Sequence, residues 1–100
     1  MSGQASISSD ILARYAADAA QEVDGVRGLS DSPLPGRRGV KVASADVGLR
    51  VELHLAVDWG ASIPDLGREV QERVRVYLAR MAGTTPAVVD VIVDEIGPRP

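Results

Sequence analysis

The chain has 100 residues, of which 45% are hydrophobic and 25% are charged; this is the composition of one small globular domain and excludes wholesale disorder. It contains no cysteine, which excludes disulfides, thiolate metal sites and cysteine nucleophiles. The net charge of −3 argues against a polyanionic partner. The chain has neither a leader-like N-terminus nor a run of about 18 uncharged apolar residues. We therefore expect a cytoplasmic protein with an aliphatic core.

The first periodic segment, "ISSDILARYAADAAQEVDG", covers residues 7–25. Its larger apolar side chains and the alanines between them fall on one stripe of an α-helix. Ser8 or Ser9 can cap the first turn of this helix. Gly25 stands where a left-handed residue is needed after the helix.

Residues 26–39 contain three glycines, two prolines and two serines. This composition predicts a loop, with room for a short extended piece at residues 26–29. A strand is expected to begin at Val40, and residues 44–48 can reverse the chain.

The clearest pattern is the stretch "LRVELHLAVDW", residues 49–59. Its side chains alternate between apolar and mainly polar, which predicts a half-buried strand with one face in water. The apolar face holds Leu49, Val51, Leu53, Leu55, Val57 and Trp59, and the other face holds Arg50, Glu52, His54, Ala56 and Asp58.

From Ser62 the period changes to that of an amphipathic helix of about 20 residues. Ser62 and Asp65 can form a capping box, Pro64 suits the first turn, and Gly83 ends the helix. The apolar stripe consists of Ile63, Leu66, Val70, Val74, Leu78 and Met81.

The segment "AVVDVIVDEI", residues 87–96, is rich in β-branched residues and predicts a last strand. The predicted fold class is an α/β (α+β) two-layer sandwich in the order α-β-β-α-β. Its sheet is mixed and three-stranded, with room for a short fourth strand, and both helices cover one face. We expect one domain over residues 7–96, a disordered tail at residues 1–6 and a second tail at residues 97–100.

His54 is the only histidine and the first candidate for chemistry, because Glu52 and Asp58 share its face. Alternate side chains on one strand are about 7 Å apart and nearly parallel, so they do not converge on a metal ion without help from other strands. The alternative is a small enzyme or metal protein centred on His54. We instead expect no catalytic, cofactor-binding or metal-ligating residue.

A second alternative is a nucleic-acid-binding module that uses Arg27, Arg37 and Arg38 in the basic stretch at residues 27–38. The run "GRRG" resembles the loop with which KH domains clamp a nucleic-acid backbone. In KH domains this loop joins two helices, whereas here it precedes a strand. The acidic net charge and the scarcity of aromatic residues also oppose this interpretation.

The open face of the predicted sheet is the candidate site, because it mixes apolar side chains with charged ones, as modest protein–protein interfaces do. The predicted interaction face consists of Lys41, Arg50, Glu52, His54, Asp58, Val88, Asp90, Ile92 and Asp94. Asp90, Asp94 and Glu95 also place negative charge at the sheet edge, which discourages unwanted strand pairing.

Several segments resemble, in order and spacing, the bacterial alkaline shock protein family of Gls-type general stress proteins. The resemblance covers residues 7–96. Its most specific parts are the "AA-x-EV-x-GV" pattern that ends the first helix, the corner "V-D-x-G-x-x-IP", and the following "E-V-Q-x-x-V".

The resemblance implies a non-enzymatic cytoplasmic protein of envelope stress homeostasis, with no catalytic residues to carry over. Some family members lie beneath the membrane, where a small membrane-anchored partner recruits them, and can self-assemble. The expected partners are therefore proteins, including further copies of the chain. No small-molecule substrate, no cofactor and no direct membrane insertion are expected. The chain lacks the charged extensions of longer relatives, and its loop at residues 30–39 is its own.

Overall fold

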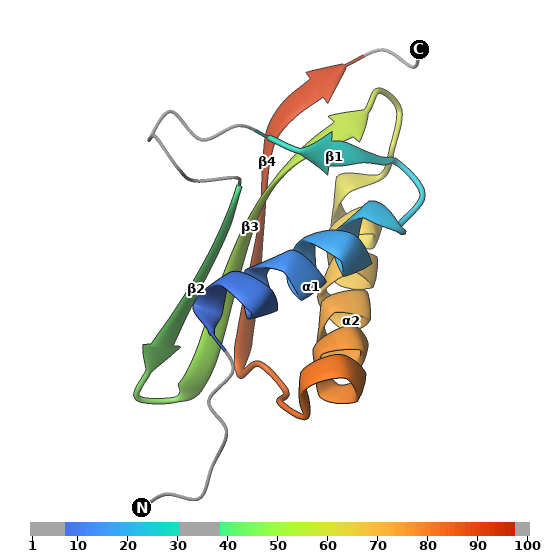
Figure 1. The fold of residues 1–100 in the computed structure, drawn as a ribbon. Helices are drawn as coiled ribbons and strands as arrows, with labels where there is room; N and C mark the ends of the chain where they lie inside the picture. The colour runs from blue at the N-terminus through green and yellow to red at the C-terminus, as the bar shows by residue number, and fades with distance from the viewer. Residues whose placement is uncertain (1–7, 31–38, 98–100) are drawn as a thin grey trace, which may run out of the picture.

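The computed structural model describes residues 8–30 and 39–97. This part of the chain forms two helices and four strands in the order α-β-β-β-α-β (Figure 1). The expected fourth strand is present, so residues 26–29 belong to the sheet and not to a loop. Gly97 belongs to the last strand, whereas the tail expected at residues 1–6 lies outside the described residues. The elements are α1 (Ser9–Gln21), β1 (Val26–Leu29), β2 (Val40–Ala45), β3 (Gly48–Asp58), α2 (Ile63–Ala82) and β4 (Val88–Gly97).

The sheet is built around β3, the longest strand. On one side β4 runs parallel to it. On the other side β1 and β2 both run antiparallel to it, β1 opposite residues 55–57 and β2 opposite residues 48–53. The sheet is therefore mixed and three strands wide. On one side of β3 the neighbouring position is filled by β1 and β2, which lie end to end. This confirms the expected fold class.

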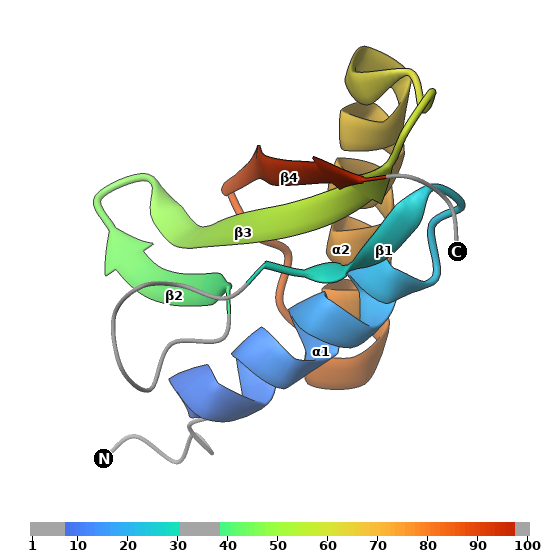
Figure 2. The same ribbon diagram turned by 90° about the horizontal axis from the view of Figure 1, so that it is seen from above.

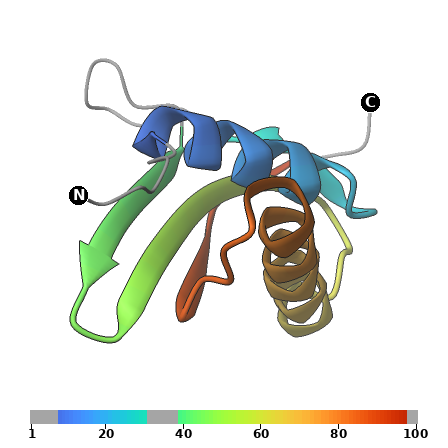
Figure 3. The ribbon, with the colours of Figure 1, turned by 60° about the horizontal axis from the view of Figure 1, so that its bottom comes forward.

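Both helices cover the same face of the sheet (Figures 2 and 3). Helix α1 crosses the sheet on the side of β1 and β2, and α2 packs beside β4 and against α1. The alanines of α1 allow the close approach, because Ala16, Ala19 and Ala20 are almost completely buried. The core between the layers consists of Leu12, Ala16, Ala19, Ala20, Val23, Val51, Leu53, Leu55, Val57, Leu66, Val70, Val74, Leu78 and Val89.

The alternation of β3 determines which face is buried. Val51, Leu53, Leu55 and Val57 are 0% exposed, while the residues between them remain partly exposed on the other side. Burying an aliphatic side chain of this size contributes roughly 1.5–3 kcal/mol. The alternation therefore anchors the register of the sheet and leaves the polar face of β3 open.

The caps predicted for the helix ends are found at some positions and not at others. The Ser8 hydroxyl accepts a hydrogen bond from the backbone N–H of Ile11 at 3.3 Å and caps α1. Gly83 ends α2 in the left-handed conformation. The expected capping box at Ser62 is wrong, because the Ser62 side chain makes no capping hydrogen bond and Asp65 instead pairs with Arg68.

The apolar stripe of α2 is buried only at its centre. Leu66, Val70, Val74 and Leu78 are buried, whereas Ile63 and Met81 are 38% and 46% exposed. The other layer covers only the four central positions of the stripe. The apolar stripe therefore extends beyond the core at both ends of α2.

Trp59 does not face the core, contrary to the expectation from the alternating pattern. Strand β3 ends at Asp58, and the chain then turns toward α2, so the period of two no longer applies. The Trp59 side chain is 71% exposed. Its backbone N–H donates to the carbonyl of Gly97 at 2.6 Å, which fixes the backbone of the turn.

Candidate interaction face on the open side of the sheet

The strand register brings the predicted face residues together. Lys41 pairs across from Glu52 on one side of β3, and Asp90 pairs with Glu52 on the other. Two residues before and after the Glu52–Asp90 pair, Val88 lies beside Arg50 and Ile92 lies beside His54. These side chains occupy neighbouring positions of three adjacent strands on the side opposite the helices.

His54 lies at the centre of a hydrogen-bond network on this face. Its Nδ1 is 2.8 Å from Oδ2 of Asp94, and its Nε2 is 2.9 Å from Oε2 of Glu52. A carboxylate only accepts hydrogen bonds, so both ring nitrogens must donate, which is the pattern of a protonated imidazole. The hydrogen bond to Glu52 is the largest cause that raises the pKa of His54 above its ordinary value. Burial is the next largest and lowers this pKa, while the hydrogen bond of Asp94 and the charges of both carboxylates raise it further.

Asp94 occupies a β-bulge. Leu55 pairs with Val93 and Ala56 pairs with Glu95, so Asp94 is an extra residue between two regular pairs. The hydrogen bond from His54, followed by one from Ser30, lowers the pKa of Asp94. The bulge aims this carboxylate at His54.

Ser30 completes the network and was not expected from the sequence. Its hydroxyl donates to Oδ2 of Asp94 at 2.9 Å, and its backbone N–H donates to the carbonyl of His54 at 2.9 Å. Ser30 is 2% exposed, the one buried polar residue in the described part of the chain. No local signal marks it, because its partner is 64 positions away in the sequence.

Two further ion pairs cross the open face. Arg50 lies 3.5 Å from Asp90, and Arg27 lies 3.9 Å from Asp58. A Cβ atom at position 97 would lie 2.0 Å from Nη1 of Arg27, so Gly97 provides the space in which the guanidinium lies. Arg27, a candidate for nucleic-acid binding, thus takes part in the open face. The other two candidates, Arg37 and Arg38, lie outside the described residues.

The face also has apolar and concave parts. Val88 and Ile92 are half-buried among the charged side chains. A depression of about 400 Å³ lies where β2, β3 and β4 meet. It is lined by Lys41, Ala43, Ser44, Ala45, Arg50, Glu52 and Asp90.

The geometry around His54 does not form a metal centre. Glu52 and Asp94 bind opposite nitrogens of the ring, so the three groups do not point at a common position. Over residues 8–30 and 39–97, no group of three or more His, Cys, Asp or Glu side chains is placed to hold a metal ion. None of the helices in the described chain is both long and apolar enough to span a bilayer.

The fold defines a class of small two-layer α/β domains that includes the MamM CTD. The cadmium form of a variant of that domain superimposes with a TM-score of 0.57 at 16% identity, over 88% of this chain and 98% of that chain. A second form, spanning residues 215–293 of that protein, has a TM-score of 0.55 at 15% identity, over 86% of this chain and 96% of that chain. At this level of identity the likeness concerns the fold alone.

Sequence comparison identifies the family. The pattern of the alkaline shock protein 23 family, described as having a cell envelope-related function, matches residues 1–98, and the chain belongs to this family. The family expected from the sequence motifs is therefore confirmed.

Two relatives are named as uncharacterized proteins. Spy1614 of Streptococcus pyogenes serotype M6 is 29% identical over 106 residues, which cover 94% of this chain and 88% of the relative. YqhY of Bacillus subtilis strain 168 is 33% identical over 89 residues, which cover 79% of this chain and 66% of the relative.

Proposed function

We propose that this protein is a non-enzymatic interaction module of cell-envelope homeostasis that binds protein partners through the open face of its sheet. The observation that carries the proposal is that this face is uncovered and combines apolar side chains with ion pairs. Neither helix covers it, and half-buried Val88 and Ile92 lie among ion pairs that are already formed. Side chains held in place before binding lose less conformational entropy when a partner docks.

The family's cell envelope-related function supports a location in the cytoplasm, at the inner face of the membrane. We propose that a small membrane-anchored protein recruits the chain there and that further copies of the chain associate with it. The proposed function requires no cofactor and no small-molecule substrate. The arrangement of His54 supports a structural role for this histidine in the interaction face, because both of its nitrogens are occupied by carboxylates.

The substitution Ile92→Asp tests the open face directly. It places a further carboxylate beside His54 and Asp94 on the exposed side of β4, so we expect capture of membrane-fraction proteins and the self-associated mass to fall at least fivefold. The measurements are quantitative affinity capture from the native cell and light scattering. Circular dichroism checks that the variant stays folded.

Val47→Asp is the matched control, because Val47 is 70% exposed in the turn between β2 and β3 and takes the same change of side chain. It should leave capture and mass unchanged. A folded Ile92→Asp variant that captures and self-associates like the unchanged protein would contradict the proposed function.

A further inference from the structure

Two exposed large apolar side chains lie where β3 and β4 end. Trp59 is 71% exposed and Ile96 is 55% exposed. Their backbones are close, because the N–H of Trp59 donates to the carbonyl of Gly97, the residue after Ile96. Single exposed apolar residues need no explanation, but an exposed tryptophan near an exposed isoleucine is a candidate binding surface. We call these two residues the Trp59 corner.

The backbone of the Trp59 corner is tied to the sheet although its side chains are exposed. The hydrogen bond from Trp59 to Gly97 measures 2.6 Å, and Ile96 pairs with the fully buried Val57 in the sheet. Tryptophan is enriched among residues that dominate binding energy, and the backbone hydrogen bond sets the position from which the Trp59 ring projects. This surface differs from the open face because Trp59 lies beyond the end of β3.

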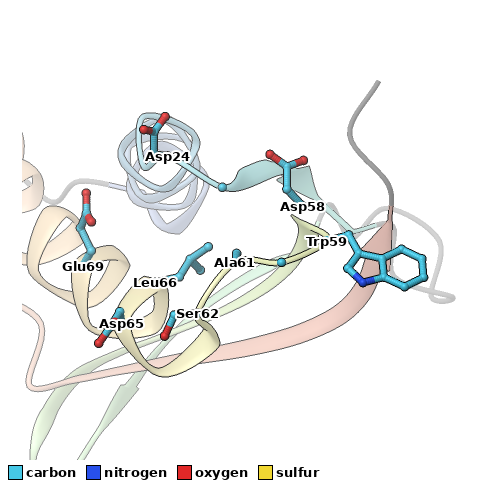
Figure 4. A pocket seen from close by; sticks show the side chains of 10 residues that line it. Asp24, Asp58, Trp59, Ala61, Ser62, Asp65, Leu66 and Glu69 are labelled. Atoms are coloured by element: carbon cyan, nitrogen blue, oxygen red, sulfur yellow. The ribbon is translucent and has the colours of Figure 1, made fainter.

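A pocket of about 470 Å³ adjoins the Trp59 corner (Figure 4). The Trp59 ring points outward at its margin, and Asp24, Asp65 and Glu69 come from the other side, where α1 ends and α2 begins. Within the described chain, no lysine or arginine lines the pocket. It is lined by Asp24, Gly25, Asp58, Trp59, Gly60, Ala61, Ser62, Asp65, Leu66 and Glu69.

Among the described residues, three of the four carboxylates that line the pocket have an arginine partner, and the fourth does not. Asp24 forms no ion pair with any described residue. Glu69 lies 3.9 Å from Arg73, and Asp58 lies 3.9 Å from Arg27. Asp65 pairs with Arg68, an exposed contact that water screens. The carboxylates therefore outnumber their arginine partners by one, Asp24, and the arginines do not line the pocket itself, so its wall carries net negative charge.

We propose that the Trp59 corner and its pocket bind a basic segment of a partner protein, with lysine or arginine side chains near the carboxylates and apolar side chains on Trp59 and Ile96. The charge selects this occupant, because carboxylates attract cations and the indole face adds a cation–π contact. The same carboxylates repel the anionic surface of a membrane and the phosphates of nucleic acid. The corner is thus a second docking surface, which shares only Asp58 with the open face.

The single tryptophan makes the test direct. The probe is the tryptophan-free peptide acetyl-KLRKLLRK-amide, titrated into the full chain while Trp59 fluorescence is recorded. We expect saturable binding with a blue shift of the emission, and affinity that falls with added salt. A peptide with glutamate in place of every lysine and arginine should leave the emission unchanged.

Charge variants separate specific docking from general attraction. The double substitution Asp24→Asn with Glu69→Gln removes two pocket charges and should weaken peptide binding by about tenfold. Asp18→Asn with Asp46→Asn removes two charges from exposed positions outside the pocket and should not weaken it. Ile92→Asp should also leave it unchanged, so failure of the open face as an interface and failure of this corner are distinguishable.

Three outcomes would overturn the inference. The first is a basic peptide that does not shift the emission. The second is equal weakening by the pocket and control variants. The third is stronger binding of the corner to vesicles containing phosphatidylglycerol than to the basic peptide, which would make a lipid surface the partner.

Discussion

Gly39→Ala is expected to destabilise the protein by about 2–4 kcal/mol. Gly39 has a φ of +78°, a conformation that costs an L-residue roughly 1–2 kcal/mol. An added Cβ would also lie 2.6 Å from the carbonyl oxygen of Ser30 and 3.0 Å from that of His54. Backbone atoms cannot move aside cheaply, so the strands next to the network must shift. Thermal unfolding should show a loss of roughly 8–32 °C in Tm, given about 4–8 °C per kcal/mol for a domain of this size.

Gly28→Ala is the control for this prediction. Gly28 has no positive φ, and an added Cβ would meet no atom within 4 Å. Its substitution should leave the free energy of unfolding unchanged or raise it by up to about 1 kcal/mol. If the Gly39→Ala and Gly28→Ala variants have the same Tm, the close backbone contact at Gly39 does not require a glycine and the prediction is wrong.

The free energy of unfolding should fall as the pH rises from 6.5 through the raised pKa of His54, because His54 then loses its proton. The pKa of His54 is raised in the folded state above its ordinary 6.5. The stabilisation from its two hydrogen bonds is therefore fully present below pH 6.5 and is lost as the pH rises through the raised value. We expect a loss of about 1 kcal/mol, because the His54 side chain is 30% exposed and water screens its ion pairs.

Denaturant midpoints at about pH 6 and about pH 8.5 measure this effect. His54→Gln should lower the midpoint at the acidic pH and leave little difference between the two conditions.

The stabilisation from Asp94 has the opposite pH dependence, because the pKa of Asp94 is lowered from the ordinary 3.8. Its contribution is present above pH 3.8 and is lost as the pH falls through the lowered value. An equal decline with pH in the unchanged protein and in His54→Gln would show that other groups cause the decline.

Much of the open face could be predicted from the sequence. Strict alternation over β3 separates the buried valines and leucines from Glu52 and His54, and parallel pairing with β4 then places Val88 and Ile92 beside them. The network could not be predicted in the same way. The bulge at Asp94 interrupts the period of two in β4, and the role of Ser30 depends on a partner in another strand. Neither feature leaves a periodic signal.

The exposure of Trp59 also could not be predicted from the sequence pattern. Alternation predicts a buried tryptophan as long as the strand continues, yet the strand ends one residue earlier and leaves the indole exposed. The position of that end depends on the turn into α2 and on the hydrogen bond to Gly97, which belongs to a strand 38 positions further along the chain.

The sequence by itself determined the two-layer fold, the buried face of β3, the central stripe of α2 and the family, because periodicity and motif spacing are properties of neighbouring residues. Only the tertiary structure decided which groups meet His54, where Arg27 lies, and that Trp59 borders an acidic pocket. The physical reason is the range of the interactions. His54 and Asp94 are 40 positions apart, so their contact exists only once the register of the sheet brings β3 and β4 together.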